Sequence, residues 1–160
     1  EEFTHRDIEY AVALPDTAVS IRCDSRHLNR LLTNLLQNAH EAIDARAGDA
    51  VPNLGAGVIS IALETEGNTA QLLIQDNGIG LPAEGRERLV EPYVTNREKG
   101  TGLGLAIVKK IMEEHGGRML LEDGVGGGAL IRLSFPLITD QQVSDDDVAE
   151  REVGKWPVIF

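Results

Sequence analysis

The sequence has few cysteines and few basic residues, and each shortage narrows what the chain can be. Its single cysteine, Cys23, can form no internal disulfide, and the CxxC pairs typical of zinc sites are absent. Lys and Arg number 15 against 26 Asp and Glu, which gives a formal net charge of -11. Because a general nucleic-acid binder needs a basic surface for the phosphate backbone, we expect no nucleic-acid partner.

Long apolar runs are also missing. No stretch approaches the roughly 18 to 20 residues of a membrane-spanning helix, and the opening residues EEFTH do not resemble a signal peptide. We therefore expect a cytoplasmic fragment without direct membrane contact, whose parent protein can still be anchored in the inner membrane. A length of 160 residues suits one domain with a sizeable core.

Hydrophobic periodicity predicts two main helices. The stronger one starts after the capping residues Asp24 and Ser25, carries apolar side chains at helical spacing, and ends before Gly48. The second is expected over about 103–115, where a pair of glycines ends it, and a short helix is expected around 86–90. The glycine-punctuated chain from 76 to 104 is otherwise irregular, and long irregular segments tend to be functional.

Alternating or apolar runs predict five strands, at 19–23, 58–64, 70–75, 118–122 and 129–135. The second and third are joined by a turn of hairpin composition and should be antiparallel neighbours. The acidic tail, 138–160, has the composition of disordered chain, and we expect it to be flexible.

Two asparagines stand on the polar side of the main helix. Asn34, Asn38 and Glu41 fall on a face away from the apolar stripe, so they are predicted to look across a cleft. A carboxamide oxygen is a neutral hard ligand, suited to a Mg²⁺ that is shared with substrate phosphates. Taken alone, the same pattern is more often a solvated helix face.

An aspartate followed by two spaced glycines comes directly after a predicted strand. The carboxylate of Asp76 can accept a hydrogen bond from an exocyclic amino group such as that of adenine, while Gly78 and Gly80 let backbone approach the ring. Asp-Asn-Gly is also an ordinary turn sequence.

A second glycine motif opens the later helix, and backbone N–H groups at a helix N-terminus favour phosphate. Arg97 and Lys99, just upstream, add cations that can reach the outer phosphates. A helix-capping flexible loop is the alternative interpretation, because isolated glycine motifs are weak signals. The motif GxxxxGK[ST] does not occur in the chain. The residues of this second motif are Gly100, Thr101, Gly102, Leu103, Gly104 and Leu105.

Between the two glycine motifs lies the run EPYVT, residues 91–95. Pro92 breaks any helix, and Tyr93 offers an apolar anchor that can pin a lid over nucleotide. Equally, Tyr93 can be ordinary core filling.

In this order the motifs resemble the series found in histidine kinase catalytic domains, which belong to the GHKL ATPases. The resemblance spans about 19–136, and 93–117 looks especially like nitrogen-regulation sensor kinases of the NtrY and NtrB type. It implies an α/β two-layer sandwich, with a mixed, largely antiparallel five-stranded sheet packed on three helices.

The resemblance also implies roles for individual residues. Asn34 and Asn38 would be catalytic, with Asn38 coordinating Mg²⁺ and Asn34 helping to place the phosphates of ATP. Asp76 would bind the adenine amino group, and Gly78 and Gly80 would admit the purine. The further nucleotide contacts that it implies are Tyr93, Thr95, Arg97, Lys99, Gly100, Thr101, Gly102, Leu103, Gly104 and Leu105.

Position 34 separates phosphoryl transfer from hydrolysis. Gyrase, Hsp90 and MutL type relatives carry a glutamate there as general base for water, and an amide cannot take a proton. Asn34 therefore favours transfer to a histidine, whose neutral imidazole nitrogen needs little activation. Some histidine kinases carry a phosphate-binding lysine where this chain has Glu41, so no phosphate contact is expected from position 41.

The four histidines, His5, His27, His40 and His115, lack the sequence context of a phosphoacceptor helix. The resemblance thus implies a catalytic domain, 1–137, that acts on a histidine in the separate dimerisation and phosphoacceptor helices of the same kinase. A cognate response regulator would be the second partner. Two alternatives stay open: a nucleotide-sensing or partner-binding module without kinase activity, and a serine kinase of the anti-sigma-factor type.

Overall fold

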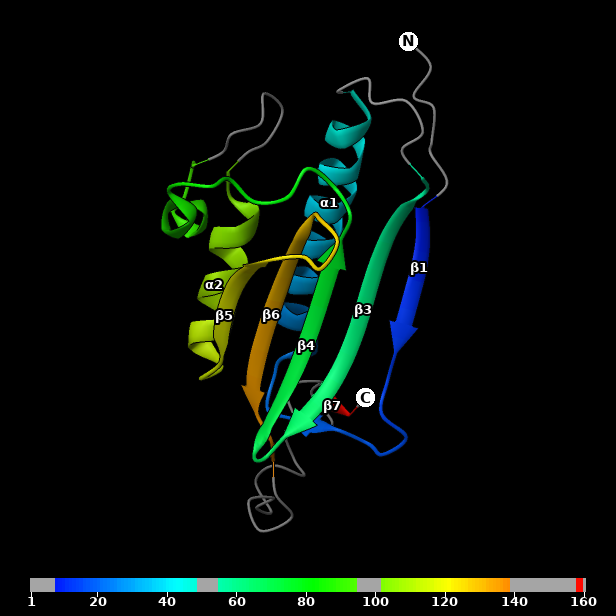
Figure 1. Cartoon of the computed structure of the whole chain (residues 1–160). Helices are drawn as coiled ribbons and strands as arrows, with labels where there is room; N and C mark the ends of the chain where they lie inside the picture. Colours follow the sequence, from blue (N-terminus) through cyan, green and yellow to red (C-terminus); the bar gives the residue numbers. More distant parts are fainter. Residues whose placement is uncertain (1–7, 49–54, 95–101, 139–157, 160) are drawn as a thin grey trace.

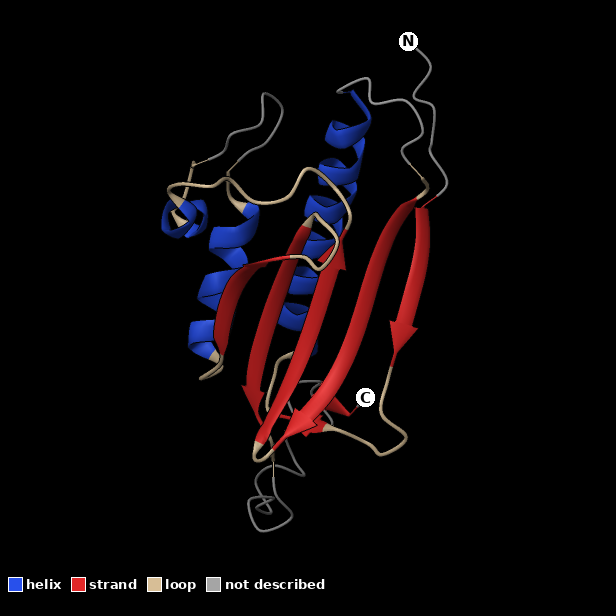
Figure 2. Cartoon of the chain, in the orientation of Figure 1, coloured by secondary structure: helices blue, strands red, loops and turns tan. Residues whose placement is uncertain are grey.

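The computed structural model describes residues 8–48, 55–94, 102–138 and 158–159, and it is an α/β sandwich (Figure 1). Two α-helices, α1 (Ser25–Gly48) and α2 (Gly104–Glu114), cover one face of a five-stranded sheet, as the colouring by secondary structure makes clear (Figure 2). The strands of this sheet are β1 (Ile8–Ala13), β3 (Gly57–Glu66), β4 (Thr69–Asp76), β5 (Arg118–Asp123) and β6 (Ala129–Pro136).

The sheet is mixed and largely antiparallel, as expected. Its order is β1-β3-β4-β6-β5, and every neighbouring pair is antiparallel except β1 and β3 at one edge. The register places Ile61, Ile74 and Ile131 side by side across three strands. Since side chains alternate between the two faces of a strand, this register turns one continuous apolar face toward the helices.

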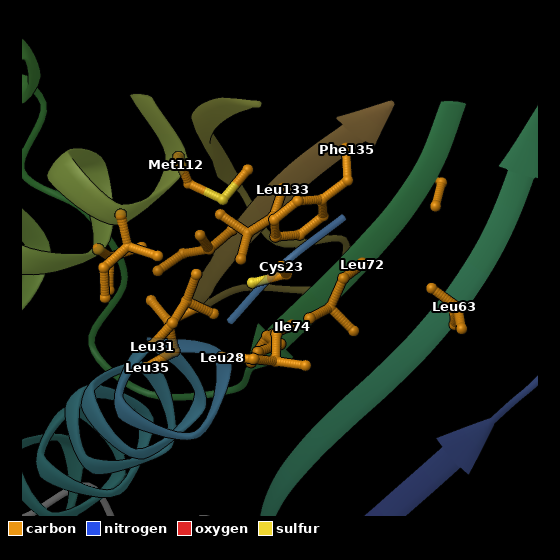
Figure 3. Close-up of a cluster of buried hydrophobic side chains, with 14 of the residues drawn as sticks. Cys23, Leu28, Leu31, Leu35, Leu63, Leu72, Ile74, Met112, Leu133 and Phe135 are labelled. Carbon is orange, nitrogen blue, oxygen red and sulfur yellow. The ribbon is translucent and has the colours of Figure 1, made fainter. Parts of the chain in front are cut away.

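The core fills the space between that face and the two helices (Figure 3). Leu31 and Leu35 of α1 are 0% and 1% exposed, and they meet buried residues of the sheet such as Ile74. Met112 of α2 completes the layer beside Leu133 of β6. Each such fully buried side chain contributes about 1.5 to 3 kcal/mol to folding, which is why the leucine stripe of α1 fixes the position of the helix on the sheet.

Asp24 caps α1, as its place before the leucine stripe predicted. Its carbonyl accepts from the N–H of Leu28 at 2.9 Å, and its Oδ1 accepts from the N–H of Arg26 at 2.8 Å. The guanidinium of Arg26 also donates to both carboxylate oxygens, at 3.2 and 2.9 Å. These hydrogen bonds, from the Arg26 side chain first and its backbone second, hold the pKa of Asp24 well below its usual range.

The expectation of three helices is only partly correct. In the described part of the chain, the third helix is a short 3-10 helix, η1 (Arg86–Val90). It cannot extend because Gly85 precedes it with a left-handed φ of 70° and the following residue, Glu91, is extended with ψ of 141°. Glu91 stands before Pro92, and the residue before a proline is disfavoured in the helical region.

The strand expected at 19–23 exists but belongs elsewhere. β2 (Ser20–Ile21) pairs with β7 (Val158–Ile159) in a separate two-stranded sheet, and the fifth strand of the main sheet is β1 instead. In β1 every residue after Ile8 is exposed. Burial on this strand therefore does not alternate, and it gives the sequence no pattern of apolar and polar residues by which the strand could be predicted. Of the acidic segment 138–160, residues 139–157 and 160 lie outside the described residues, and its flexibility stays a prediction. Within the described ranges, no helix has both the length and the apolarity that crossing a membrane requires.

Candidate functional site

A cavity of about 480 Å³ opens where α1, the end of β4 and the start of α2 meet. The described part of the connection after β4, residues 77–94, runs across this end of the molecule, at the top of Figure 1. The wall of the cavity is partly apolar, with Leu81, Leu89 and Ile107 among the lining residues. The cavity brings together many residues of the expected site, namely Asn34, Asn38, Asp76, Gly80, Gly102, Leu103, Gly104 and Leu105.

Asp76, the last residue of β4, is held in the cavity wall by backbone hydrogen bonds. Its side chain Oδ1 accepts from the N–H of Gly78 at 2.8 Å and from the N–H of Ala129 at 3.3 Å. Asp76 is 7% exposed and is the one buried charged residue in the described part of the chain. Burying a carboxylate is costly unless it is hydrogen-bonded, so these donors explain why the charge is tolerated at this position.

The residues that follow Asp76 are tied to both layers of the sandwich. Asn77 accepts from the N–H of Val58 at 2.9 Å and donates to the carbonyl of Ala56 at 3.1 Å, which fastens the turn to the start of β3. The N–H of Ile79 donates to the carbonyl of Ala42 in α1 at 3.1 Å. The loop is therefore fixed to the sheet on one side and to the helix on the other.

Gly78 has a packing role that the sequence did not predict. A methyl carbon at this position would lie 2.4 Å from the carbonyl carbon of Ala42 and 2.6 Å from its oxygen, so only glycine lets the loop approach α1 this closely. Gly78 is buried and is absent from the cavity lining. Gly80 does line the cavity, and its φ of 77° is in the left-handed region that favours glycine.

The two asparagines of α1 meet the first residue of α2. A methyl carbon on Gly104 would lie 3.3 Å from Oδ1 of Asn38 and 3.4 Å from Oδ1 of Asn34. The Nδ2 of Asn34 donates to the carbonyl of Arg30 at 2.7 Å, which fixes the orientation of its amide. No acidic residue stands in the first turn of α2 and no side chain caps it, so the positive end of the helix dipole faces this part of the cavity.

Tyr93 and Gly102 meet through their backbones at the margin of the cavity. The N–H of Tyr93 donates to the carbonyl of Gly102 at 3.0 Å, and a methyl carbon on Gly102 would lie 2.7 Å from the carbonyl carbon of Tyr93. The side chain of Tyr93 is 80% exposed, so the alternative that it fills the core is wrong. The remaining expected contacts, Thr95, Arg97, Lys99, Gly100 and Thr101, lie outside the described residues.

Comparison with known proteins assigns the chain to a family. Residues 23–139 match the family model described as histidine kinase-, DNA gyrase B-, and HSP90-like ATPase. The chain belongs to this family. The glycines and asparagines that meet in the cavity of this ATPase domain all fall within the matched residues.

The curated relatives of this ATPase domain include sensor kinases. The chain is 50% identical over 132 residues to the nitrogen regulation protein NtrY of Azorhizobium caulinodans. It is 34% identical over 132 residues to the sensor histidine kinase ZraS of Escherichia coli O157:H7. Both matches cover 82% of this chain, but only 17% and 27% of the relatives. The chain thus spans about a sixth to a quarter of the length of the relatives it matches.

Solved structures of histidine kinases share the fold. The mycobacterial sensor histidine kinase MprB is 29% identical, with a TM-score of 0.67 over 81% of this chain and 82% of that one. Full-length ShkA in complex with AMPPNP is 27% identical, with a TM-score of 0.66 over 82% of this chain and 26% of that one. The expected two-layer sandwich with a mixed five-stranded sheet is confirmed.

Some cavity residues of this ATPase domain were not predicted from the sequence. The apolar wall formed by Leu81, Leu89 and Ile107 gives no motif, because its members come from a loop, η1 and α2. Gly128 lies outside the cavity lining and packs against the backbone of Asp76; it belongs to the run of three glycines at 126–128, which is part of the motif series of the resemblance. Glu41, by contrast, was predicted to look across a cleft; it lines the cavity and accepts from Nε2 of Gln37 at 3.1 Å.

Proposed function

We propose that this domain binds ATP with Mg²⁺ and donates the γ-phosphoryl group to a histidine on a separate domain of the same kinase. The observation that carries the proposal is the meeting of Asn34 and Asn38 with Gly104 at the N-terminus of α2. It puts amide oxygens beside helix N–H groups, which together suit a phosphate chain and its metal ion. The relatives named as sensor histidine kinases support the same activity.

The base of the nucleotide would bind at the Asp76 end of the cavity. Carboxylate oxygens only accept hydrogen bonds, which matches the exocyclic amino group of adenine. The apolar wall that includes Leu81, Leu89 and Ile107 suits the faces of a purine ring. Gly80 lines the same region, and its missing side chain lets this turn lie against Gly128. ShkA, of similar fold, has been crystallised with AMPPNP.

The amide of Asn38 fits a magnesium ion by the chemistry of its donor. Its Oδ1 is a neutral oxygen at the cavity wall, and Mg²⁺ in phosphate sites takes few protein ligands and keeps several waters. When bound, magnesium supplies charge neutralisation for the phosphates. Asn38 would hold the ion, Asn34 would position the phosphates, and the backbone N–H groups of Leu103 and Gly104 would donate to phosphate oxygens.

Transfer is favoured over hydrolysis because, among the described residues, no suitable general base stands at the phosphate end. Position 34 is an amide, which cannot take a proton from water. The only carboxylates among the described lining residues are Asp76 and Glu41. Asp76 is bonded to backbone N–H groups at the end of β4, and Glu41 accepts a hydrogen bond from Nε2 of Gln37.

The acceptor and the wider partners follow from the same proposal. His27, His40 and His115 are the histidines of the described part, and none of them lines the cavity. We therefore propose that residues 1–137 form the catalytic domain, acting on the dimerisation and phosphoacceptor helices of the same kinase in a cytoplasmic two-component system with a cognate response regulator. Thr95, Arg97, Lys99, Gly100 and Thr101 remain proposed contacts from the connection between Tyr93 and Gly102.

The test combines nucleotide binding with transfer. The chain is incubated with labelled ATP, Mg²⁺ and the separately supplied phosphoacceptor domain of its parent kinase, and acid-labile phosphate on the acceptor is measured. Asn38→Asp and Asp76→Asn should abolish transfer, whereas Asn29→Asp, the same type of change as Asn38→Asp on the exposed side of α1, should leave it intact. Full transfer by both site variants would overturn the assignment.

Two other outcomes would select the alternatives. Normal ATP affinity without transfer to any acceptor indicates a nucleotide-sensing module without kinase activity. Acid-stable phosphate on a serine of an antagonist protein indicates a kinase of the anti-sigma-factor type.

A further inference from the structure

A single guanidinium, which does not itself line the cavity, joins two loops beside it. The Nη2 of Arg86 donates to Oδ1 of Asp123 at 2.7 Å, and its Nε donates to the carbonyl of Pro82 at 2.8 Å. Arg86 is the first residue of η1 and Asp123 the last residue of β5. We infer that Arg86 is a positioning residue that holds the base-binding wall of the nucleotide cavity in place, an inference that rests on the proposed function.

On one side, Arg86 shapes the loop that supplies part of the wall. Its bond to Pro82 closes the turn that contains Gly85, whose φ is 70°. Pro82 and its neighbour Leu81 line the cavity from this turn, and Leu89 lines it from the following 3-10 helix. A displacement of Arg86 would therefore move apolar groups that face the ligand.

On the other side, Asp123 begins the loop that supports Asp76. The N–H of Gly124 donates to the carbonyl of Gly128 at 3.0 Å, and Nε2 of Gln75 donates to the carbonyl of Val125 at 3.0 Å. Gly128 then touches the backbone of Asp76, where a methyl carbon would lie 1.9 Å from the carbonyl oxygen. The loop anchored by Asp123 thus ends against the residue proposed to read the base.

The two loops also meet each other. A methyl carbon on Gly80 would lie 3.2 Å from the carbonyl oxygen of Gly128, so the turn after β4 and the loop before β6 are in contact near the cavity. Arg86 connects the same two segments at their outer ends. The wall is consequently fastened at two points, through Gly80 and Gly128 inside and through Arg86 outside.

The chemistry of arginine is required for this connection. Its side chain is 31% exposed and that of Asp123 is 66% exposed, and exposed ion pairs alone contribute little to stability. The planar guanidinium, however, donates to two acceptors on different segments at once. A lysine would keep the charge but would not present two donors in this fixed arrangement.

The experiment measures the affinity of the chain for ATP in the presence of Mg²⁺, and for GTP, with the unfolding midpoint of the ATP-free protein measured in parallel. The variants are Arg86→Gln, Asp123→Asn, the double variant and Arg86→Lys. Arg88→Gln is the matched control, because Arg88 lies in the same 3-10 helix and its ion pair with Glu91, at 3.9 Å, is exposed. Asp123→Asn keeps the bond between Arg86 and Pro82, so it remains informative if Arg86→Gln folds poorly.

We expect Arg86→Gln and Asp123→Asn to weaken ATP binding by about three- to tenfold, the change that loss of one ordinary, partly exposed hydrogen bond produces. The preference for ATP over GTP should fall with it, because the base-binding wall is affected. The double variant should bind no more weakly than Arg86→Gln alone, and Arg86→Lys should be intermediate. The control should stay within about twofold of the unchanged chain, and the unfolding midpoint of Asp123→Asn should match that of the control.

Unchanged ATP binding in Arg86→Gln and Asp123→Asn would overturn the inference while leaving the proposed function intact. A loss of affinity that follows the unfolding midpoint, with the preference for ATP over GTP retained, would also overturn it. Failure of the unchanged chain to bind ATP would instead overturn the proposed function itself.

Discussion

Gly128 and Asp76 are in direct backbone contact, with no room for a side chain between them. A methyl carbon on Gly128 would lie 1.9 Å from the carbonyl oxygen of Asp76, and Gly128 has a φ of 79°. The contact links the loop before β6 to the end of β4, and so it sets the position of the carboxylate in the cavity wall.

Gly128→Ala should therefore destabilise the fold and weaken ATP binding. Overpacking costs about 1 to 3 kcal/mol, and the left-handed backbone adds about 1 to 2 kcal/mol for a residue with a Cβ. Urea unfolding measures the loss of stability, and ATP titration measures the loss of affinity. Gly126→Ala is the matched control, because Gly126 also has a positive φ, 83°, but has nothing within 4 Å. Equal losses in the two variants would show that the contact with Asp76 contributes nothing.

Gly78→Ala should destabilise the chain by about 1 to 3 kcal/mol, because the added methyl would overlap the backbone of α1 at Ala42. The free energy of unfolding in urea checks this. At Gly55, where nothing lies within 4 Å, the same change should be neutral or slightly stabilising. Normal stability of Gly78→Ala combined with weak ATP binding would instead assign Gly78 to the purine site.

Asp24→Ala should lower the free energy of unfolding by about 1 kcal/mol at pH 7, since α1 loses its cap. Asp24→Asn should cost less, because asparagine also caps helices well. The pKa of Asp24 is lower in the folded chain than in the unfolded one, because of its hydrogen bonds to Arg26. Its ionised form therefore stabilises the fold above the unfolded pKa of about 4, and this part is lost as pH falls through the folded pKa. Unfolding curves at pH 7 and pH 3 should show Asp24→Asn approaching the unchanged chain at the lower pH.

Cys23 should be unreactive toward thiol reagents in the folded protein. It is fully buried, and burial together with the neighbouring carboxylate of Asp24 raises the pKa of its thiol to about 11. Thiolate is the reactive form, so labelling by a disulfide reagent at pH 8 should be slow and should become fast in 6 M urea, roughly as for a free thiol of pKa about 8.5. Equally fast labelling in both conditions would contradict the position of Cys23 in the core.

Periodicity predicted the elements that bury one face. The leucine stripe of α1 and the cap at Asp24 gave both the extent of the helix and its orientation on the sheet. β1 was not predicted, because it lies at the edge of the sheet, where Tyr10 and Val12 are 50% and 60% exposed and burial imposes no pattern on the sequence. β2 was predicted as a strand, but its pairing with the far end of the chain depends on contacts that no local pattern contains.

The motifs predicted which residues would meet but not how each one would act. Asn38, Asp76 and Gly104 do line one cavity, because each follows or starts an element whose place the core fixes. Gly78 and Tyr93 differ, since the first packs against α1 and the second is exposed with a left-handed backbone. A sequence motif records that a residue type is needed at a position, and both packing and ligand binding can create that need.

Helix α1 has a consequence for the dimensions of the pocket. It carries Asn38 and, one turn further along, Ala42, whose carbonyl receives the N–H of Ile79 from the turn after Asp76. The residues that would bind the phosphates and the residues that would bind the base are thus both attached to one helix, which rises about 1.5 Å per residue. The spacing of Asn38 and Ala42 along α1 therefore sets the distance between the two ends of the site, and with it the length of the ligand that fits. Inserting or removing one residue between positions 38 and 42 would change that distance and rotate one end of the site relative to the other.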